Sequence, residues 1–155
     1  MTKFEQLTQE ANDDGLEVLE ITFRSNRIKG LYYSNTIAIN DKLKSSRKKA
    51  CVLAEEIAHH NLTVGNILDL SDTQNRKQEL LARVKAYNHM VGLTGLIRSY
   101  EYGCRSLYEM AEFLDVTETF LKDALEAYRL KYGEGITIDN YYITFEPCLS
   151  VAKIL

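Results

Sequence analysis

Short apolar runs separated by polar turns dominate the first part of the chain. Residues 2–12 have a polar helical pattern, which Asp13-Asp14-Gly15 ends with turn-forming residues. Three runs rich in β-branched and aromatic residues follow, at 16–23, 28–33 and 36–40. Ser34-Asn35 separates the last two runs in the manner of a tight hairpin turn. The pattern predicts a small antiparallel sheet of three strands, with residues 36–40 as a candidate edge strand.

From Ser46, a suitable N-cap, the apolar positions follow a helical period. One stripe of this helix carries the apolar side chains Ala50, Leu53, Ala54, Ile57 and Ala58. A loop is expected at residues 61–72, with Gly65-Asn66 just past the helix end. Further helices are predicted at 73–90, 94–101, 106–114 and 117–132, the last capped by Thr117 and stopped by Gly133. Residues 136–145 alternate as one or two strands do.

These elements predict an α+β fold in one domain, residues 1–155. The sheet and the first long helices occupy about 15–90, and a helical subregion occupies about 94–133. A chain of 155 residues is long enough for one core and too short for two comfortable domains.

The composition indicates the class of protein and its cellular compartment. Apolar residues make up 45% and charged residues 26% of the chain, and the net charge of −3 favours neither nucleic acid nor anionic membrane. The sequence contains no apolar run of about 18 residues, and residues 1–6 lack the apolar stretch of a signal peptide. The odd set Cys51, Cys104 and Cys148 has no metal-type spacing, as is usual for reduced thiols. We therefore expect a cytoplasmic protein.

The segment Glu55-Glu56-Ile57-Ala58-His59-His60 looks like a His-Glu-x-x-His zinc-peptidase motif in which Glu55 replaces the first histidine. Residues four apart share a helix face, so Glu55 and His59 are candidate ligands of one metal ion. Glu79, on the next predicted helix, is the candidate third ligand. Glu56 would stand beside the metal as general base. Such a carboxylate-rich site accepts zinc, and manganese or iron more readily than a histidine-rich site does.

Two alternatives remain open for this segment. Glu-Glu pairs are common on solvated helix faces, and a histidine pair near a helix C-terminus interacts favourably with the helix dipole. Glu56 and His60 are also four residues apart, so they are an alternative ligand pair.

The segment from Leu107 to Leu121 has the pattern of a helix-turn-helix. A DNA reader needs basic and amide side chains at the start of its second helix, whereas Glu118 and Asp123 stand there with Lys122 as the nearby cation. We therefore expect no direct binding of nucleic acid, and interpret the unit as a packing element or a docking face.

The order of elements resembles the ImmA/IrrE family of metallopeptidase-like proteins of prophages and mobile elements. The similarity is carried by Gly30-Leu31-Tyr32-Tyr33, by the segment from Leu53 to His60, and by Gln78-Glu79-Leu80-Leu81. A phage-borne branch of that family also shows Glu-Glu-x-x-His-His. The resemblance implies a zincin-like fold, with His59 and Glu79 as ligands and Glu56 as general base.

The resemblance also implies a function, a metal-dependent endopeptidase that cleaves a helix-turn-helix repressor of the same element and so relieves repression. Tyr32 and Tyr33 would then either stabilise the oxyanion or simply pack. The alternative is a catalytically inactive relative that binds the repressor without cleaving it. The departure at Glu55 from the usual histidine is what separates the two.

Overall fold

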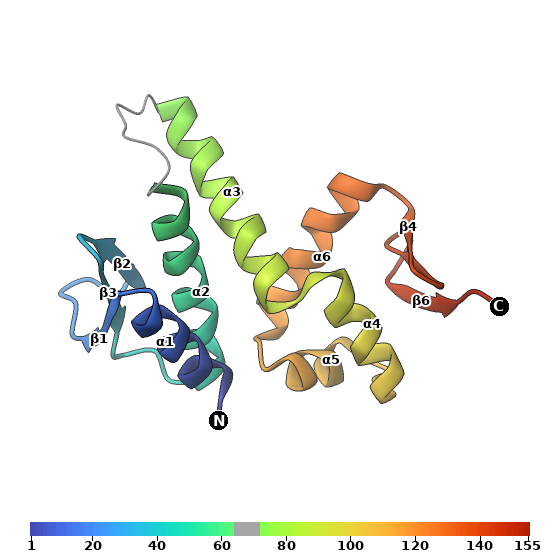
Figure 1. The fold of residues 1–155 in the computed structure, drawn as a ribbon, viewed down its shortest axis with the longest axis horizontal. Helices are drawn as coiled ribbons and strands as arrows, with labels where there is room; N and C mark the ends of the chain where they lie inside the picture. The colour runs from blue at the N-terminus through green and yellow to red at the C-terminus, as the bar shows by residue number, and fades with distance from the viewer. Residues whose placement is uncertain (64–71) are drawn as a thin grey trace. The chain divides into compact units, whose positions relative to one another are not determined.

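The computed structural model describes residues 1–63 and 72–155, and the chain divides into two compact units, Met1–Ala86 and Tyr87–Leu155 (Figure 1). The elements that begin in the first unit are α1 (Lys3–Asp13), β1 (Glu17–Ile21), β2 (Gly30–Tyr33), β3 (Thr36–Asn40), α2 (Ser46–Thr63) and α3 (Asp72–Met90). Those of the second unit are α4 (Gly92–Tyr102), α5 (Leu107–Leu114), α6 (Glu118–Tyr132), β4 (Gly135–Ile138), β5 (Tyr141–Thr144) and β6 (Ser150–Lys153). The α+β class predicted from the sequence is confirmed.

The sheet of the first unit has the strand order β1-β3-β2. The hairpin of β2 and β3 is antiparallel as predicted, and Ser34 and Asn35 turn it with φ angles of 48° and 63°. The predictions that the whole sheet is antiparallel and that β3 is an edge strand are wrong, because β1 pairs with β3 in parallel and β3 lies in the middle. The physical reason is burial, since Ile37 and Ile39 of β3 are fully buried while β1 and β2 keep exposed positions.

Helices α1 and α2 cover one face of this sheet (Figure 1). The core between them contains Leu7 and Ala11 of α1, Ile37 and Ile39 of β3, and the predicted α2 stripe of Ala50, Leu53, Ala54 and Ala58. The residue that caps the start of α2 is Ser45, one residue before the predicted N-cap Ser46. The Oγ of Ser45 accepts a hydrogen bond of 3.0 Å from the Lys48 N–H. The apolar stripe fixes which side of α2 faces the sheet.

The loop predicted at 61–72 overlaps helices at both ends, because α2 continues to Thr63 and α3 begins at Asp72. The rest of the predicted loop, residues 64–71, lies outside the described residues. Gly65-Asn66, the predicted stop of α2, lies outside the described residues. On α3 the buried side chains of the first unit are Ala82 and Ala86, whereas Leu80 and Leu81 are exposed.

The second unit packs α4, α5 and α6 with an antiparallel sheet of strand order β4-β5-β6. Thr117 caps α6 as predicted, its Oγ1 accepting a hydrogen bond of 3.1 Å from the Phe120 N–H. Asp115, with φ 58°, ends α5 and gives the short turn between the two helices. Strand β6 was not predicted, because its four residues are mostly exposed and carry no apolar alternation. Among the residues described, none of the helices is both long enough and apolar enough to cross a membrane.

Candidate metal centre

The middle of α2 brings Glu55, Glu56 and His59 to the wall of one cavity. Because the apolar stripe of α2 packs on the sheet, these three side chains fall at the border of the buried face and are half-buried. The cavity has a volume of about 370 Å³, and Gly30, Leu31, Tyr32, Glu55, Glu56, His59 and Glu79 line it. All four residues that the sequence singled out as ligands or base therefore lie around the same space.

Helix α3 runs beside α2 and supplies Glu79 (Figure 1). The Oε2 of Glu79 lies 3.4 Å from the Nε2 of His59. Two ligands held at roughly 2.0–2.1 Å by a tetrahedral metal are about 3.3–3.4 Å apart. The separation of these two donor atoms therefore fits a shared metal ion, although it equally suits a direct ion pair between the two side chains.

Glu55 lines the cavity from the turn of α2 that precedes His59. Burial raises the pKa of its carboxyl group, and the nearby charges of Arg83 and His59 act in the opposite direction. Within residues 1–63 and 72–155, no group of three or more His, Cys, Asp and Glu side chains is arranged to hold a metal. The donor atoms of His59 and Glu79 have the spacing of two metal ligands. Among the described residues, no third donor is arranged with them to complete a metal site.

Glu56 is the most perturbed acid of the cavity. Burial raises the pKa of its carboxyl group to about 7, and the negative charges of Glu55 and Glu79 add to the effect. A carboxyl group with a pKa near neutrality both accepts and returns a proton readily, as a general base must.

Gly30 of β2 lies close to the side chain of Glu56. A β-carbon at position 30 would lie 3.2 Å from the Cγ of Glu56 and 2.7 Å from the Cγ1 of Val52. The strand can approach α2 this closely only because residue 30 has no side chain. The sequence reasoning missed this contact, and a glycine at the start of a strand was the one signal available.

His60 points to a different neighbour. Its Nδ1 lies 2.8 Å from the hydroxyl of Tyr32, and it is absent from the cavity wall. The geometry therefore favours Glu55 and His59 over Glu56 and His60 as the pair that faces a metal.

Comparison with known proteins identifies one family. The model of the peptidase M78 family, described as the IrrE N-terminal-like domain, matches residues 11–126. The match includes the α2 segment, Glu79 and the hairpin of β2 and β3. No curated protein matches the chain.

Proposed function

Because the chain belongs to the peptidase M78 family of IrrE N-terminal-like domains, we propose that it is a metal-dependent endopeptidase. Membership confirms the resemblance to the ImmA/IrrE family and makes the chain a metallopeptidase-like protein with a zincin-like fold. The observation that carries the further step to an active enzyme is the convergence of Glu56, His59 and Glu79 on one cavity.

In this proposal Glu55, His59 and Glu79 hold the metal, which is zinc, with manganese or iron as substitutes that the carboxylates tolerate. When bound, such an ion polarises the scissile carbonyl and makes a water molecule more acidic. The 3.4 Å separation of the His59 and Glu79 donor atoms supports two of the three ligands. The position of Glu55 in the same cavity wall supports its assignment as the third ligand.

Glu56 acts as general base. Its carboxylate takes a proton from the attacking water and returns the proton to the nitrogen of the leaving amine. Because residue 30 has no β-carbon, the side chain of Glu56 has room to lie against the strand, with its carboxyl group at the cavity wall. When a metal ion is bound, its positive charge would favour the ionised form of Glu56, which is the form that accepts a proton.

The substrate peptide extends along β2. This strand is at the edge of the sheet, and three of its residues, Gly30, Leu31 and Tyr32, line the cavity. An extended peptide that pairs with a sheet edge is held by backbone hydrogen bonds. The edge role expected of β3 thus passes to β2.

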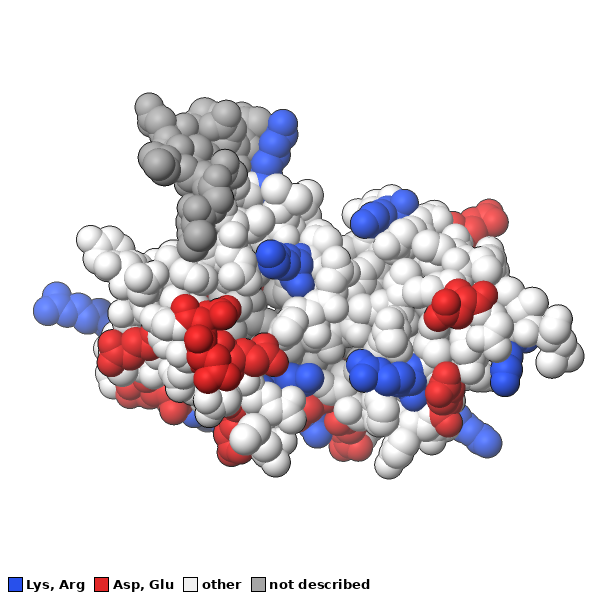
Figure 2. All heavy atoms as spheres, in the orientation of Figure 1, with Lys and Arg blue, Asp and Glu red and all other residues white. Residues whose placement is uncertain are grey.

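The proposed substrate is a helix-turn-helix repressor encoded by the same prophage or mobile element, and the setting is the cytoplasm. The resemblance to the ImmA/IrrE family implies this substrate, and the free thiols of Cys51, Cys104 and Cys148 suit the cytoplasm. The protein would reach the repressor directly rather than through DNA. On the face shown in Figure 2, acidic side chains gather over the first unit, and the basic ones are scattered without forming a continuous patch.

A catalytically inactive regulator is the second candidate. It is favoured by the finding that the described residues hold no complete group of three metal donors. Such a protein would bind the repressor through the same edge and cavity without hydrolysing it.

Metal content tests the proposal. The protein is purified without a histidine tag or chelator, and zinc, manganese and iron are measured per chain. We expect about one ion per chain, lost in Glu79→Ala and kept in Glu112→Ala, an exposed glutamate of α5. If no metal binds even when each ion is supplied in excess, the inactive regulator replaces the peptidase.

A further inference from the structure

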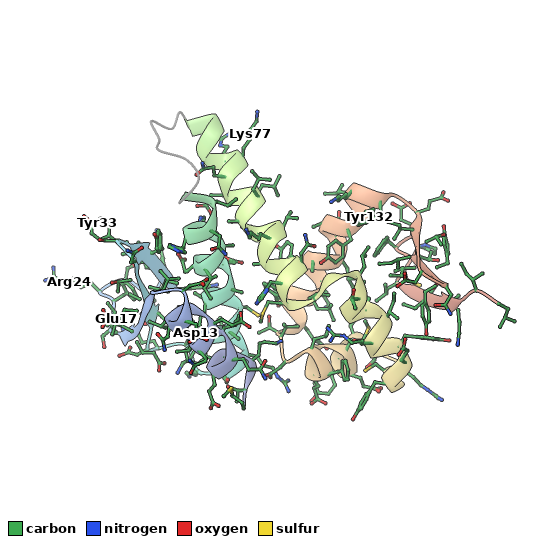
Figure 3. All side chains as sticks on the ribbon, in the orientation of Figure 1. Asp13, Glu17, Arg24, Tyr33, Lys77 and Tyr132 are labelled. Carbon is green, nitrogen blue, oxygen red and sulfur yellow. The ribbon has the colours of Figure 1, made fainter. Side chains whose placement is uncertain are left out.

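Tyr32 contributes its side chain to the wall of the proposed active site. Along β2 the side chains alternate, so Leu31 and Tyr33 are 52% and 77% exposed, while Tyr32 is half-buried on the side of α2. In Figure 3, Tyr33 extends outward from the hairpin, away from α2. The alternation gives the two neighbouring tyrosines different surroundings, with Tyr32 at the cavity.

The hydroxyl of Tyr32 is held by His60. The distance from the Tyr32 Oη to the His60 Nδ1 is 2.8 Å, and the two rings meet edge to face with centroids 5.3 Å apart. His60 follows His59 by one residue, about 100° further round α2, so its ring leaves the cavity and reaches the strand. The position of the phenol is therefore fixed by its strand and by His60.

The placement of hydrogens decides what Tyr32 can do. A phenol has one hydrogen to donate and also accepts hydrogen bonds, and a neutral imidazole carries a hydrogen on one of its two nitrogens. If the hydrogen of His60 is on Nδ1, His60 donates to the Oη of Tyr32. The phenolic hydrogen then remains available to an acceptor in the cavity.

We propose that Tyr32 stabilises the oxyanion of the peptidase reaction and that His60 positions it by donating a hydrogen bond from Nδ1. This inference rests on the function proposed above. When water adds to the scissile carbonyl, negative charge develops on the carbonyl oxygen, and the hydroxyl of Tyr32 donates a hydrogen bond to it without giving up its proton. His60 thus acts on the reaction by positioning Tyr32 of β2, while the neighbouring His59 faces Glu79.

The test compares a tetrahedral anion with a planar carbonyl. Zinc-loaded protein is titrated calorimetrically with N-phosphoryl-Leu-Trp and with N-formyl-Leu-Trp. For Tyr32→Phe we expect the phosphoryl compound to bind about 10- to 100-fold more weakly and the formyl compound to bind unchanged. Tyr33→Phe is the matched control, because this exposed neighbour should leave both affinities unchanged.

Variants of His60 test the positioning role. His60→Leu removes the donor and should weaken phosphoryl binding by about 3- to 10-fold. His60→Gln keeps an N–H that can reach the phenol and should restore most of that loss. Equal losses in the leucine and glutamine variants would overturn the role of His60.

A second readout needs no metal. In the metal-free protein labelled with ¹⁵N-histidine, we expect the neutral His60 ring to carry its hydrogen on Nδ1, with a chemical shift that changes in Tyr32→Phe. A hydrogen on Nε2 would mean that Tyr32 donates to His60, which overturns the proposal.

The outcomes of the titration distinguish the role of Tyr32 from the proposed peptidase function. Tight phosphoryl binding that Tyr32→Phe leaves unchanged overturns the role of Tyr32 and leaves the peptidase standing. If the zinc-loaded natural protein does not distinguish the phosphoryl from the formyl compound, both proposals fall.

Discussion

Gly30 and Glu56 approach each other so closely that a β-carbon on residue 30 would lie 3.2 Å from the Cγ of Glu56. The edge strand β2 is thereby packed directly against the residue proposed as general base. The missing side chain at residue 30 leaves the space that Glu56 occupies beside β2.

Replacing Gly30 by alanine should displace Glu56. The added methyl group meets both Val52 and Glu56, so we expect a loss of about 1–3 kcal/mol in the free energy of unfolding, together with at least a tenfold loss of peptidase activity. Urea denaturation and a cleavage assay measure the two effects.

The double variant Gly30→Ala with Val52→Ala separates packing from catalysis. Removing the Val52 methyl groups opens the 2.7 Å contact, so most of the stability should return, while the activity should stay low because the contact with Glu56 persists. Val52→Ala alone is the control. Full recovery of activity in the double variant would show that Gly30 does not act through Glu56.

Glu56→Gln should keep the fold and the metal and abolish cleavage. The amide has nearly the same shape, but it cannot take a proton from water, and we expect the rate to fall by about 100-fold or more. The measurement is cleavage of the proposed repressor substrate by zinc-loaded protein, with metal content determined on the same samples. An unchanged rate would refute the role of Glu56 as base, and unchanged relief of repression in cells would favour the inactive regulator.

The metal-free protein should become less stable as the pH rises. The pKa of Glu56 is about 7 in the folded protein against an ordinary value of 4.5, so the folded state binds more protons between these values. The stabilisation is complete below about pH 4.5 and is lost as the pH rises through about 7. Glu55, whose pKa is also raised, acts in the same direction.

This dependence should be weaker in Glu56→Gln. At pH 8 we expect that variant to exceed the natural protein in free energy of unfolding by about 1–3 kcal/mol, because it carries no charge to desolvate. Urea denaturation at pH 5 and pH 8 with a chelator present makes the comparison, and Glu112→Gln serves as control. A natural protein more stable at pH 8 than at pH 5 would contradict the raised pKa.

Glu55→His should strengthen zinc binding. It restores the histidine of the usual motif at a position that already lines the cavity, and it removes one negative charge from beside Glu56 and Glu79. We expect at least a tenfold lower dissociation constant for zinc, measured by competition with a chromophoric chelator. Equal or weaker affinity would argue that residue 55 is not a ligand.

The local sequence determined most of the helices and the pairing of site residues along α2. Asp13-Asp14-Gly15 ends α1, Thr117 begins α6, and the four-residue spacing of Glu55 and His59 puts both on one face, because capping and helical period depend only on neighbouring residues. The tertiary structure decided what lies far apart in sequence. It inserted β3 between β1 and β2, brought Glu79 to within 3.4 Å of His59, and turned His60 toward Tyr32. Strand order and contacts between elements are set by which apolar faces can be buried together, and a pattern read along one segment carries no information about the partner it will meet.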